Sequence, residues 1–338
     1  MLHTLRGDHL LWYGIICSAG QLFLFGSPAI YCLYRYPETR KVLRAPLDLN
    51  SISALLSFSG WNLFGTLSMV VRSQGPAVLL NIFFGPVANA AYGLAGQVGG
   101  FVGEISWGVL RATTPPIIKR KAAGDIEGMK QLAHYGNLFS LVVLWLVTCP
   151  VLFETNYCLT IWLHRTPPFT SGFIQLIIIA LLIDQLTSGY TAVIQASGNI
   201  AVYSIVVSVM NCGAVFLGYF MMRLGFSPLS VLRACVVGSI LAGCSRLWFA
   251  RTNGGITVYE WLAKVFFPAA LCVLGTSCAM LWINRTAPEG FFRVVISTIM
   301  SALVTTALCW WSGISRPHRI FFAAQLKRRF RSIVLFDT

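Results

Sequence analysis

The segment LLNIFFGPVANAAYGLAGQV, Leu79 to Val98, is apolar enough for a lipid bilayer, yet it contains two asparagines, a glutamine and several glycines. An unpaired polar group in hydrocarbon costs several kcal/mol, because no water is present there to bond with it. We therefore expect the amides of this segment to face other protein groups or a water-filled space.

The composition of the whole chain predicts a polytopic membrane protein. Of its 338 residues, 56% are hydrophobic and 11% are charged, and the mean hydropathy is +0.72. A water-soluble domain of this size carries far more charge on its surface. The formal net charge is +14, and the basic residues collect in a few loops and in the C-terminal tail. This distribution favours contact with an anionic membrane surface over contact with nucleic acid.

The first apolar segment and the cysteines exclude two other interpretations. Residues 10–34 are too long for a cleaved secretory peptide and are not followed by a small-residue cleavage site. The ten cysteines lie mostly inside apolar segments and show no CxxC spacing. We interpret them as small apolar side chains and expect neither a disulfide framework nor a metal site.

Nine segments are apolar enough to cross a membrane, for which a helix needs about 20 residues. We expect them at 10–34, 51–72, 80–112, 132–153, 168–193, 200–222, 228–249, 258–283 and 290–313. Turn sequences such as QASGN at 195–199 and RLGFSP at 223–228 separate them. Because several connections have only a few residues, neighbouring helices should be antiparallel.

Lys and Arg are concentrated in the loops on one side of these helices. Basic clusters follow the first span at 35–44, the third at 119–130 and the last at 316–331, whereas the opposite loops hold mostly single basic residues. Positive loops stay in the cytoplasm, so we expect the N-terminus outside and the C-terminus inside. The tail mixes Phe and Leu with cations and is interpreted as an amphipathic helix on the inner leaflet.

The polar residues of the third span share one face when the span is drawn as a helix: Asn89, Gln97, Glu104 and Arg111 fall together. Asn89 and Gln97 either hold helices together or line a cavity. For Glu104 with Arg111 a cavity is favoured, because a buried carboxylate is costly without a role. A separate strip of small residues, where a second helix can approach closely, consists of Gly96, Gly99 and Gly103.

Two further spans carry polar faces. Asp184 lies near the middle of the fifth span, on one face with Ser188 and Thr191. An intramembrane carboxylate is a candidate for coupling transport to protons or cations, and the alternative is a structural pair with a nearby arginine. On the second span, Asn62 lies on the polar side, and Arg72, near the expected outer end, either snorkels to the surface or belongs to the site.

Signatures of soluble enzymes are missing from the sequence. It contains no GxxxxGK[ST] phosphate loop, no HExxH metal motif and no GxSxG nucleophile motif. We therefore expect a protein that is not an enzyme and that uses no cofactor.

Several stretches resemble the bacterial polysaccharide flippases, the exporters of O-antigen (lipopolysaccharide) and capsule repeat units in the MATE-like superfamily. They are LLSFSGWNLFGTLSMVVRSQGPAVLLNIFFGPVANAAYGLAGQV at 55–98, PPIIKRKAAGDIEGM at 115–129, LFETNYCLTIWL at 152–163 and LLIDQLTSGYTAVIQASGNIAVYSIVV at 181–207. The resemblance covers roughly residues 10–285.

The resemblance implies an all-α fold of two six-helix lobes around a central cavity, of which this chain corresponds to the C-terminal part. Residues 1–50 would form a leading helix and a basic cytoplasmic loop, 51–252 the second lobe, 253–315 two additional helices and 316–338 the cytoplasmic tail. Such a chain would be a truncated product, a protein with an earlier start, or a half-transporter that pairs with another chain.

The implied substrate is an oligosaccharide on an undecaprenyl pyrophosphate carrier, moved across the bacterial inner membrane by alternating access. The implied partners are membrane lipids and a polysaccharide polymerase or glycosyltransferases, and no nucleic acid. On this reading, the substrate cavity is lined by Asn62, Arg72, Asn89, Gln97 and Arg111, and an ion is coupled by Glu104 and Asp184.

Three other functions are compatible with the sequence. One is a cation-coupled multidrug exporter of the same fold. Another is a membrane polymerase or ligase, which would need a large external loop, whereas the longest one here, around 154–166, is short. The third is a non-transporting membrane partner in polysaccharide biosynthesis.

Overall fold

The computed structural model describes residues 9–36, 49–163, 166–198 and 200–313, and within these ranges the chain forms helices and no strand. The expected amphipathic tail and most of the first basic loop lie outside the described residues. The chain divides into two compact units, Met1–Ser59 and Gly60–Thr338. The first unit contains α1 (His9–Arg35) and the beginning of α3 (Leu49–Ala122).

Seven of the described helices are long and apolar enough to cross a membrane, which confirms an all-α, multi-pass membrane protein. The number is lower than the nine expected segments for two reasons. The stretch Leu63–Ala122 is one continuous assignment of 60 residues, long enough for more than one span, and the apolar helix α6 (Thr170–Gln185) is short, at 16 residues. The number of membrane crossings therefore stays a prediction.

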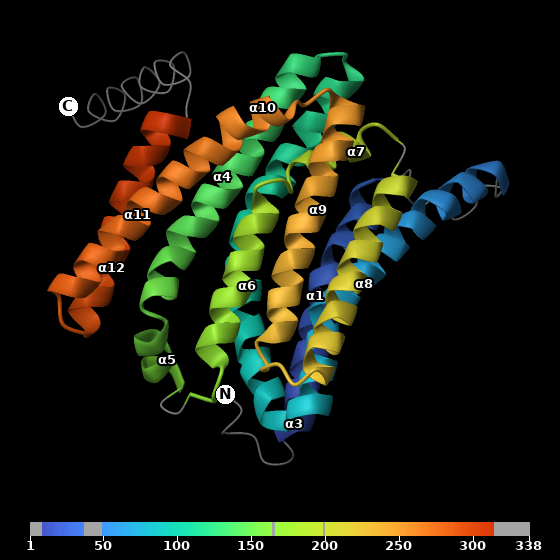
Figure 1. Cartoon of the computed structure of the whole chain (residues 1–338). Helices are drawn as coiled ribbons and strands as arrows, with labels where there is room; N and C mark the ends of the chain where they lie inside the picture. The colour runs from blue at the N-terminus through green and yellow to red at the C-terminus, as the bar shows by residue number, and fades with distance from the viewer. Residues whose placement is uncertain (1–8, 37–48, 164–165, 199, 314–338) are drawn as a thin grey trace, which may run out of the picture. The chain divides into compact units, whose positions relative to one another are not determined.

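Within the second unit, α3 turns back on itself at Gly85 and forms a helical hairpin (Figure 1). Gly85 has φ 79° and ψ −177°, a conformation open almost only to glycine, and the following Pro86 disfavours a helical residue before it. The hydroxyl of Tyr92, after the turn, donates to the carbonyl of Ser73, before the turn, at 2.7 Å. The two arms of the hairpin therefore lie side by side at this level.

The expected break between the second and third spans, at 73–79, is wrong. The helix continues through this stretch although it contains Gly75 and Pro76. A Cβ atom on Gly75 would lie 2.8 Å from Val215 of α8 (Ala201–Arg223). This glycine thus allows close helix packing, and the second Gly-Pro pair, at 85–86, makes the turn. Gly99 also has the expected packing role, because a Cβ there would collide with Ile177 of α6.

The expected continuous fifth span, 168–193, is also wrong. Helix α6 ends at Gln185, a turn follows, and the six-residue helix α7 begins at Tyr190 (Tyr190–Gln195). Gly189 fits the turn because a Cβ there would approach the side-chain oxygen of Asn137 to 2.9 Å. The same oxygen accepts a hydrogen bond from the Gly189 amide at 2.6 Å.

Helices α4 (Ile126–Phe153) and α9 (Ser230–Gly254) pack against this broken segment from opposite sides (Figure 1). Helices α8 and α9 form an antiparallel pair, and α9 also packs on α6 and α7. On the other side, α4 contacts α6 and α7 and carries α11 (Phe267–Thr286) and α12 (Phe291–Leu308). Short segments complete the unit: α5 (Thr155–Leu163), α10 (Val258–Trp261) and the π-helical turns Leu262–Phe266 and Cys309–Gly313.

Candidate functional site

A pocket of about 680 Å³ lies within the second unit, between the two arms of α3 and helices α6, α7, α8 and α9. Much of its wall is apolar, with Met69, Ile177 and Leu181 among the lining residues. Four charged residues also line it: Arg72, Arg111, Asp184 and Arg246. Because they lie on apolar, membrane-type helices, the pocket is a candidate functional site.

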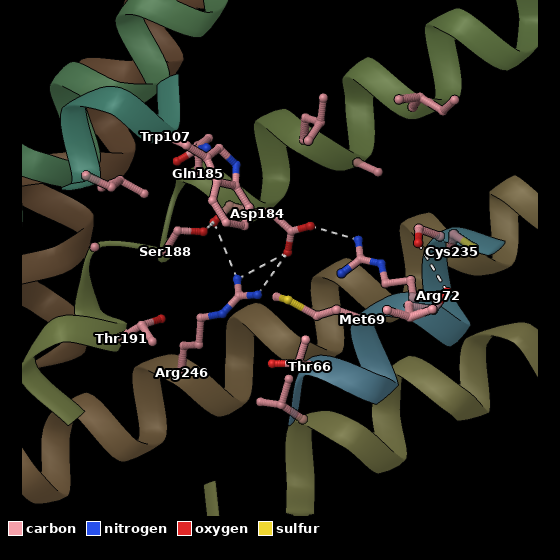
Figure 2. Close-up of a pocket in the computed structure, with 18 of the residues that line it drawn as sticks. Thr66, Met69, Arg72, Trp107, Asp184, Gln185, Ser188, Thr191, Cys235 and Arg246 are labelled. Carbon is pink, nitrogen blue, oxygen red and sulfur yellow. Dashed lines mark hydrogen bonds and ion pairs between the residues drawn. The ribbon is translucent and has the colours of Figure 1, made fainter. Parts of the chain in front are cut away.

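The centre of the charged group is Asp184, which bridges two arginines from different helices (Figure 2). Its Oδ2 accepts from Nη2 of Arg72 at 2.7 Å. Its Oδ1 accepts from Nη1 and Nη2 of Arg246 at 3.1 and 3.2 Å. The exposed fractions of the three side chains are 17% for Arg72, 16% for Asp184 and 5% for Arg246, so the cluster is largely withdrawn from solvent.

Neutral side chains complete the cluster. Ser239 of α9 donates its hydroxyl to Asp184 at 3.2 Å and also accepts from Arg72. Nη1 of Arg72 donates to the Asn211 amide oxygen at 3.4 Å. Nη1 of Arg246 donates to the Thr187 hydroxyl, in the turn after α6, at 3.2 Å. The cluster therefore links α3, α6, α8 and α9 at the place where the α6–α7 segment is interrupted.

The interruption exposes backbone groups that would be bonded in a continuous helix, and neighbouring side chains satisfy two of them. Trp261 donates its indole N–H to the carbonyl of Leu186 at 3.0 Å. Asn137 of α4 accepts from the Gly189 amide, and His134, one turn earlier, lies 2.9 Å from the Tyr190 hydroxyl. The turn is thus held from two sides, which fixes the backbone that carries Asp184.

A second polar group of the pocket lies beside Asp184. Gln185 is 1% exposed, and its Nε2 donates to the Ser106 hydroxyl at 2.7 Å, whereas its Oε1 accepts no hydrogen bond from the described residues. Trp107, on the same arm of α3 as Ser106, also lines the pocket and is drawn close to Gln185 (Figure 2). The pocket therefore offers an aromatic surface next to its charged centre.

Three of the seven site residues expected from the sequence line this pocket: Arg72, Arg111 and Asp184. Arg72 does not snorkel at a helix end, because the arm continues for thirteen residues to the turn at Gly85. Asp184 pairs with two arginines, Arg72 and Arg246, and its role in ion coupling stays a prediction. The side chain of Asn62 lies outside the described residues.

Three other expected residues are absent from the lining of the pocket: Asn89, Gln97 and Glu104. Gln97 and Glu104 are exposed on α3. Glu104 pairs with Arg111 at 3.1 Å, and their side chains are 67% and 65% exposed. The pocket is lined by a neighbouring face of the second arm of α3, which carries Trp107 and Thr114. Arg111 lies at the edge of that face. The helical-wheel argument found the polar stripe but not which part of it turns inward.

Sequence reasoning missed Arg246 and Ser239 as members of the site. A signal was present, because the two residues are seven positions apart on α9, which places them two turns apart on one face. An arginine facing a serine inside an apolar helix indicates a polar contact within the bundle. Local spacing in the sequence does not show which acidic residue of another helix pairs with that arginine.

The chain matches none of the protein-family models, curated proteins or solved structures with which it was compared. Among the described residues, no group of three or more His, Cys, Asp or Glu side chains lies close enough together to hold a metal ion. What the geometry defines is a multi-pass membrane protein with an arginine-rich internal pocket.

Proposed function

We propose that this protein takes part in moving an oligosaccharide on an undecaprenyl pyrophosphate carrier across the bacterial inner membrane. The observation that carries the proposal is the charge of the pocket: three arginines and one carboxylate line it. Positive charge in excess on membrane-type helices favours an anionic ligand, and arginine is the side chain best suited to phosphate oxygens.

The rest of the pocket fits an amphiphilic ligand of this class. Apolar side chains such as Met69 and Ile177 can meet the isoprenoid chain next to the phosphate, while the hydroxyl of Ser188 can bond sugar hydroxyls. Trp107 offers a flat surface for a sugar ring. The interrupted helix beside Asp184 also supports a transport role, since discontinuous helices commonly border the substrate sites of transporters.

A cation-coupled drug exporter is less well supported by the same residues. Such a protein needs a carboxylate that can bind a proton or a cation, but both oxygens of Asp184 already accept from arginines. A cationic drug would also meet a pocket whose charged lining is mainly positive.

The proposal is tested by complementation of a bacterial strain that lacks its own flippase. We expect expression of the chain to restore surface polysaccharide, and Arg246→Gln to lower the restored amount by about tenfold or more, because a buried charge partner is lost. The matched control is Arg251→Gln, an exposed arginine near the end of the same helix and outside the pocket, which should restore normally.

Membrane levels of each variant are compared by immunoblot. The proposal is contradicted if the wild-type chain reaches the membrane but restores no polysaccharide. It is also contradicted if Arg246→Gln restores as much as the control.

A further inference from the structure

We propose that Asp184 is an internal counter-anion, which occupies the place between Arg72 and Arg246 that a phosphate group of the ligand takes when it binds. The inference rests on the proposed function, which it extends by assigning the two arginines to the pyrophosphate and Asp184 to a competing role. On this view the carboxylate does not couple an ion; it keeps the arginines positioned and satisfied until the ligand arrives.

The geometry of the cluster is that of an anion site already filled by a side chain. The carboxylate accepts four hydrogen bonds: one from Arg72 and one from the Ser239 hydroxyl on Oδ2, and two from Arg246 on Oδ1. A phosphate group presents oxygen acceptors of the same kind and accepts bidentate bonds from arginine. Exchange of carboxylate for phosphate would therefore leave both arginines bonded.

The charge balance of the cluster favours the exchange. Two guanidinium groups face one carboxylate, so the cluster is left with one positive charge in a largely solvent-excluded position. Uncompensated charge is costly in such a position, so the cluster attracts a further anion. A ligand with two negative charges can pair with both arginines, and the displaced Asp184 carboxylate then turns into the pocket, which has room for water. A sugar-linked pyrophosphate diester carries two negative charges, whereas the carboxylate of Asp184 supplies one.

The position of Asp184 in the chain permits its side chain to move while the backbone stays in place. It is the second-last residue of α6, and its own carbonyl accepts from the amide of Ser188 at 3.0 Å and from the Ser188 hydroxyl at 2.6 Å. The carboxylate faces the pocket of about 680 Å³, which gives it room to rotate away from the arginines.

Anion binding by the purified full chain in nanodiscs of zwitterionic lipid tests the inference. Two probes are used, inorganic pyrophosphate and farnesyl pyrophosphate, which distinguish a free anion from a lipid-linked one. Removing the competing carboxylate by Asp184→Asn should tighten the binding of farnesyl pyrophosphate by about tenfold or more. Adding Arg246→Gln to Asp184→Asn should abolish that gain.

The matched control is Glu154→Gln. Glu154 is a buried carboxylate that also pairs with an arginine, Arg293, at 2.6 Å, but neither residue lines the pocket. The Glu154→Gln variant should bind both probes with the affinity of the wild type. If Asp184→Asn is too unstable for titration, thermal unfolding is measured with and without pyrophosphate, and the stabilisation by the anion should be larger for this variant than for the wild type.

Each result decides one point. If the wild type binds farnesyl pyrophosphate and Asp184→Asn binds it equally or more weakly, the counter-anion role is overturned while the proposed function stands. If neither protein binds either probe, the site recognises no pyrophosphate, and the inference fails together with the proposed function. If both bind inorganic pyrophosphate but not the lipid probe, the site takes a free anion and the proposed function is overturned.

Discussion

At the scale of single residues, buried charge in this protein is organised as arginine–carboxylate pairs. In the pocket, Asp184 forms ion pairs with two arginines. Elsewhere, Glu154, between α4 and α5, forms an ion pair with Arg293 in the first turn of α12. The Glu154 side chain is 1% exposed and that of Arg293 8%. Such pairs contribute less to stability than their short distances imply, but loss of one partner leaves a buried charge unmatched.

We expect Glu154→Gln to lower the free energy of unfolding by about 2 kcal/mol, because Arg293 keeps only Glu289 as an acidic neighbour. The measurement is reversible unfolding of the purified protein in mild detergent. Glu289→Gln is the control, since that side chain is 79% exposed and should change stability by less than about 0.5 kcal/mol. Equal losses for the two variants would contradict this assignment.

At the scale of secondary-structure elements, two interruptions shape the second unit: the hairpin turn at Gly85 and the break between α6 and α7. Both depend on a glycine, for different reasons. Gly85 adopts a backbone conformation with positive φ, whereas Gly189 leaves room for the Asn137 side chain that bonds its amide. The first turn brings Arg72 and Trp107 to one pocket, and the second places Asp184 beside them.

Replacing Gly85 by alanine should destabilise the protein by about 1 to 3 kcal/mol, because only glycine adopts its φ and ψ without strain. No atom would meet the added Cβ, so the effect is one of backbone alone. Gly96→Ala is a suitable comparison, since Gly96 is helical and its Cβ would also meet nothing. For Gly96→Ala we expect the free energy of unfolding to rise by up to about 1 kcal/mol. Thermal unfolding of both variants checks the difference, and a harmless Gly85→Ala would show that the turn adapts.

At the scale of the whole second unit, basic residues from distant parts of the sequence gather at one end. Lys121, at the end of α3, donates to the carbonyl of Asn253, at the end of α9, at 2.9 Å, and Lys130 pairs with Glu260 at 3.8 Å. The turns at 85 and at 224–229 lie at the opposite end (Figure 1). The basic ends of α3 and α9 lie at the same end of the unit. The uneven distribution of Lys and Arg among the loops therefore corresponds to an uneven distribution of charge in the folded unit.

By the positive-inside rule, the end that carries Lys121 should face the cytoplasm. Alkaline phosphatase fused after Gly124 should therefore be inactive, and the same enzyme fused after Ser227 should be active outside. Green fluorescent protein at the same two positions provides the control for expression, because it should fluoresce only after Gly124. The reverse pattern at both positions would contradict the proposed orientation.

The sequence by itself determined the class of the protein and the existence of polar faces on its helices. Hydropathy and length decide whether a segment enters a bilayer, because the transfer energy is a sum over residues that needs no knowledge of neighbours. For the same reason, the carboxylate Asp184 and the arginines Arg72 and Arg111 could be picked out as exceptional residues in apolar segments. Of the predicted small-residue strip, Gly99 lies in a close contact between helices, whereas a Cβ on Gly96 would meet no atom of the described residues.

Only the tertiary structure decided which of two Gly-Pro pairs makes the hairpin turn, where the fifth span breaks, and which polar side chains meet. Gly75 and Gly85 have the same local sequence signal, and the difference lies in the approach of Val215 from α8. Asp184 meets Arg246 across 62 positions of sequence and Arg72 across 112. Such contacts depend on how whole helices rotate and pack against each other. Local periodicity shows which residues share one face of a helix, but it does not show which neighbouring helix that face meets.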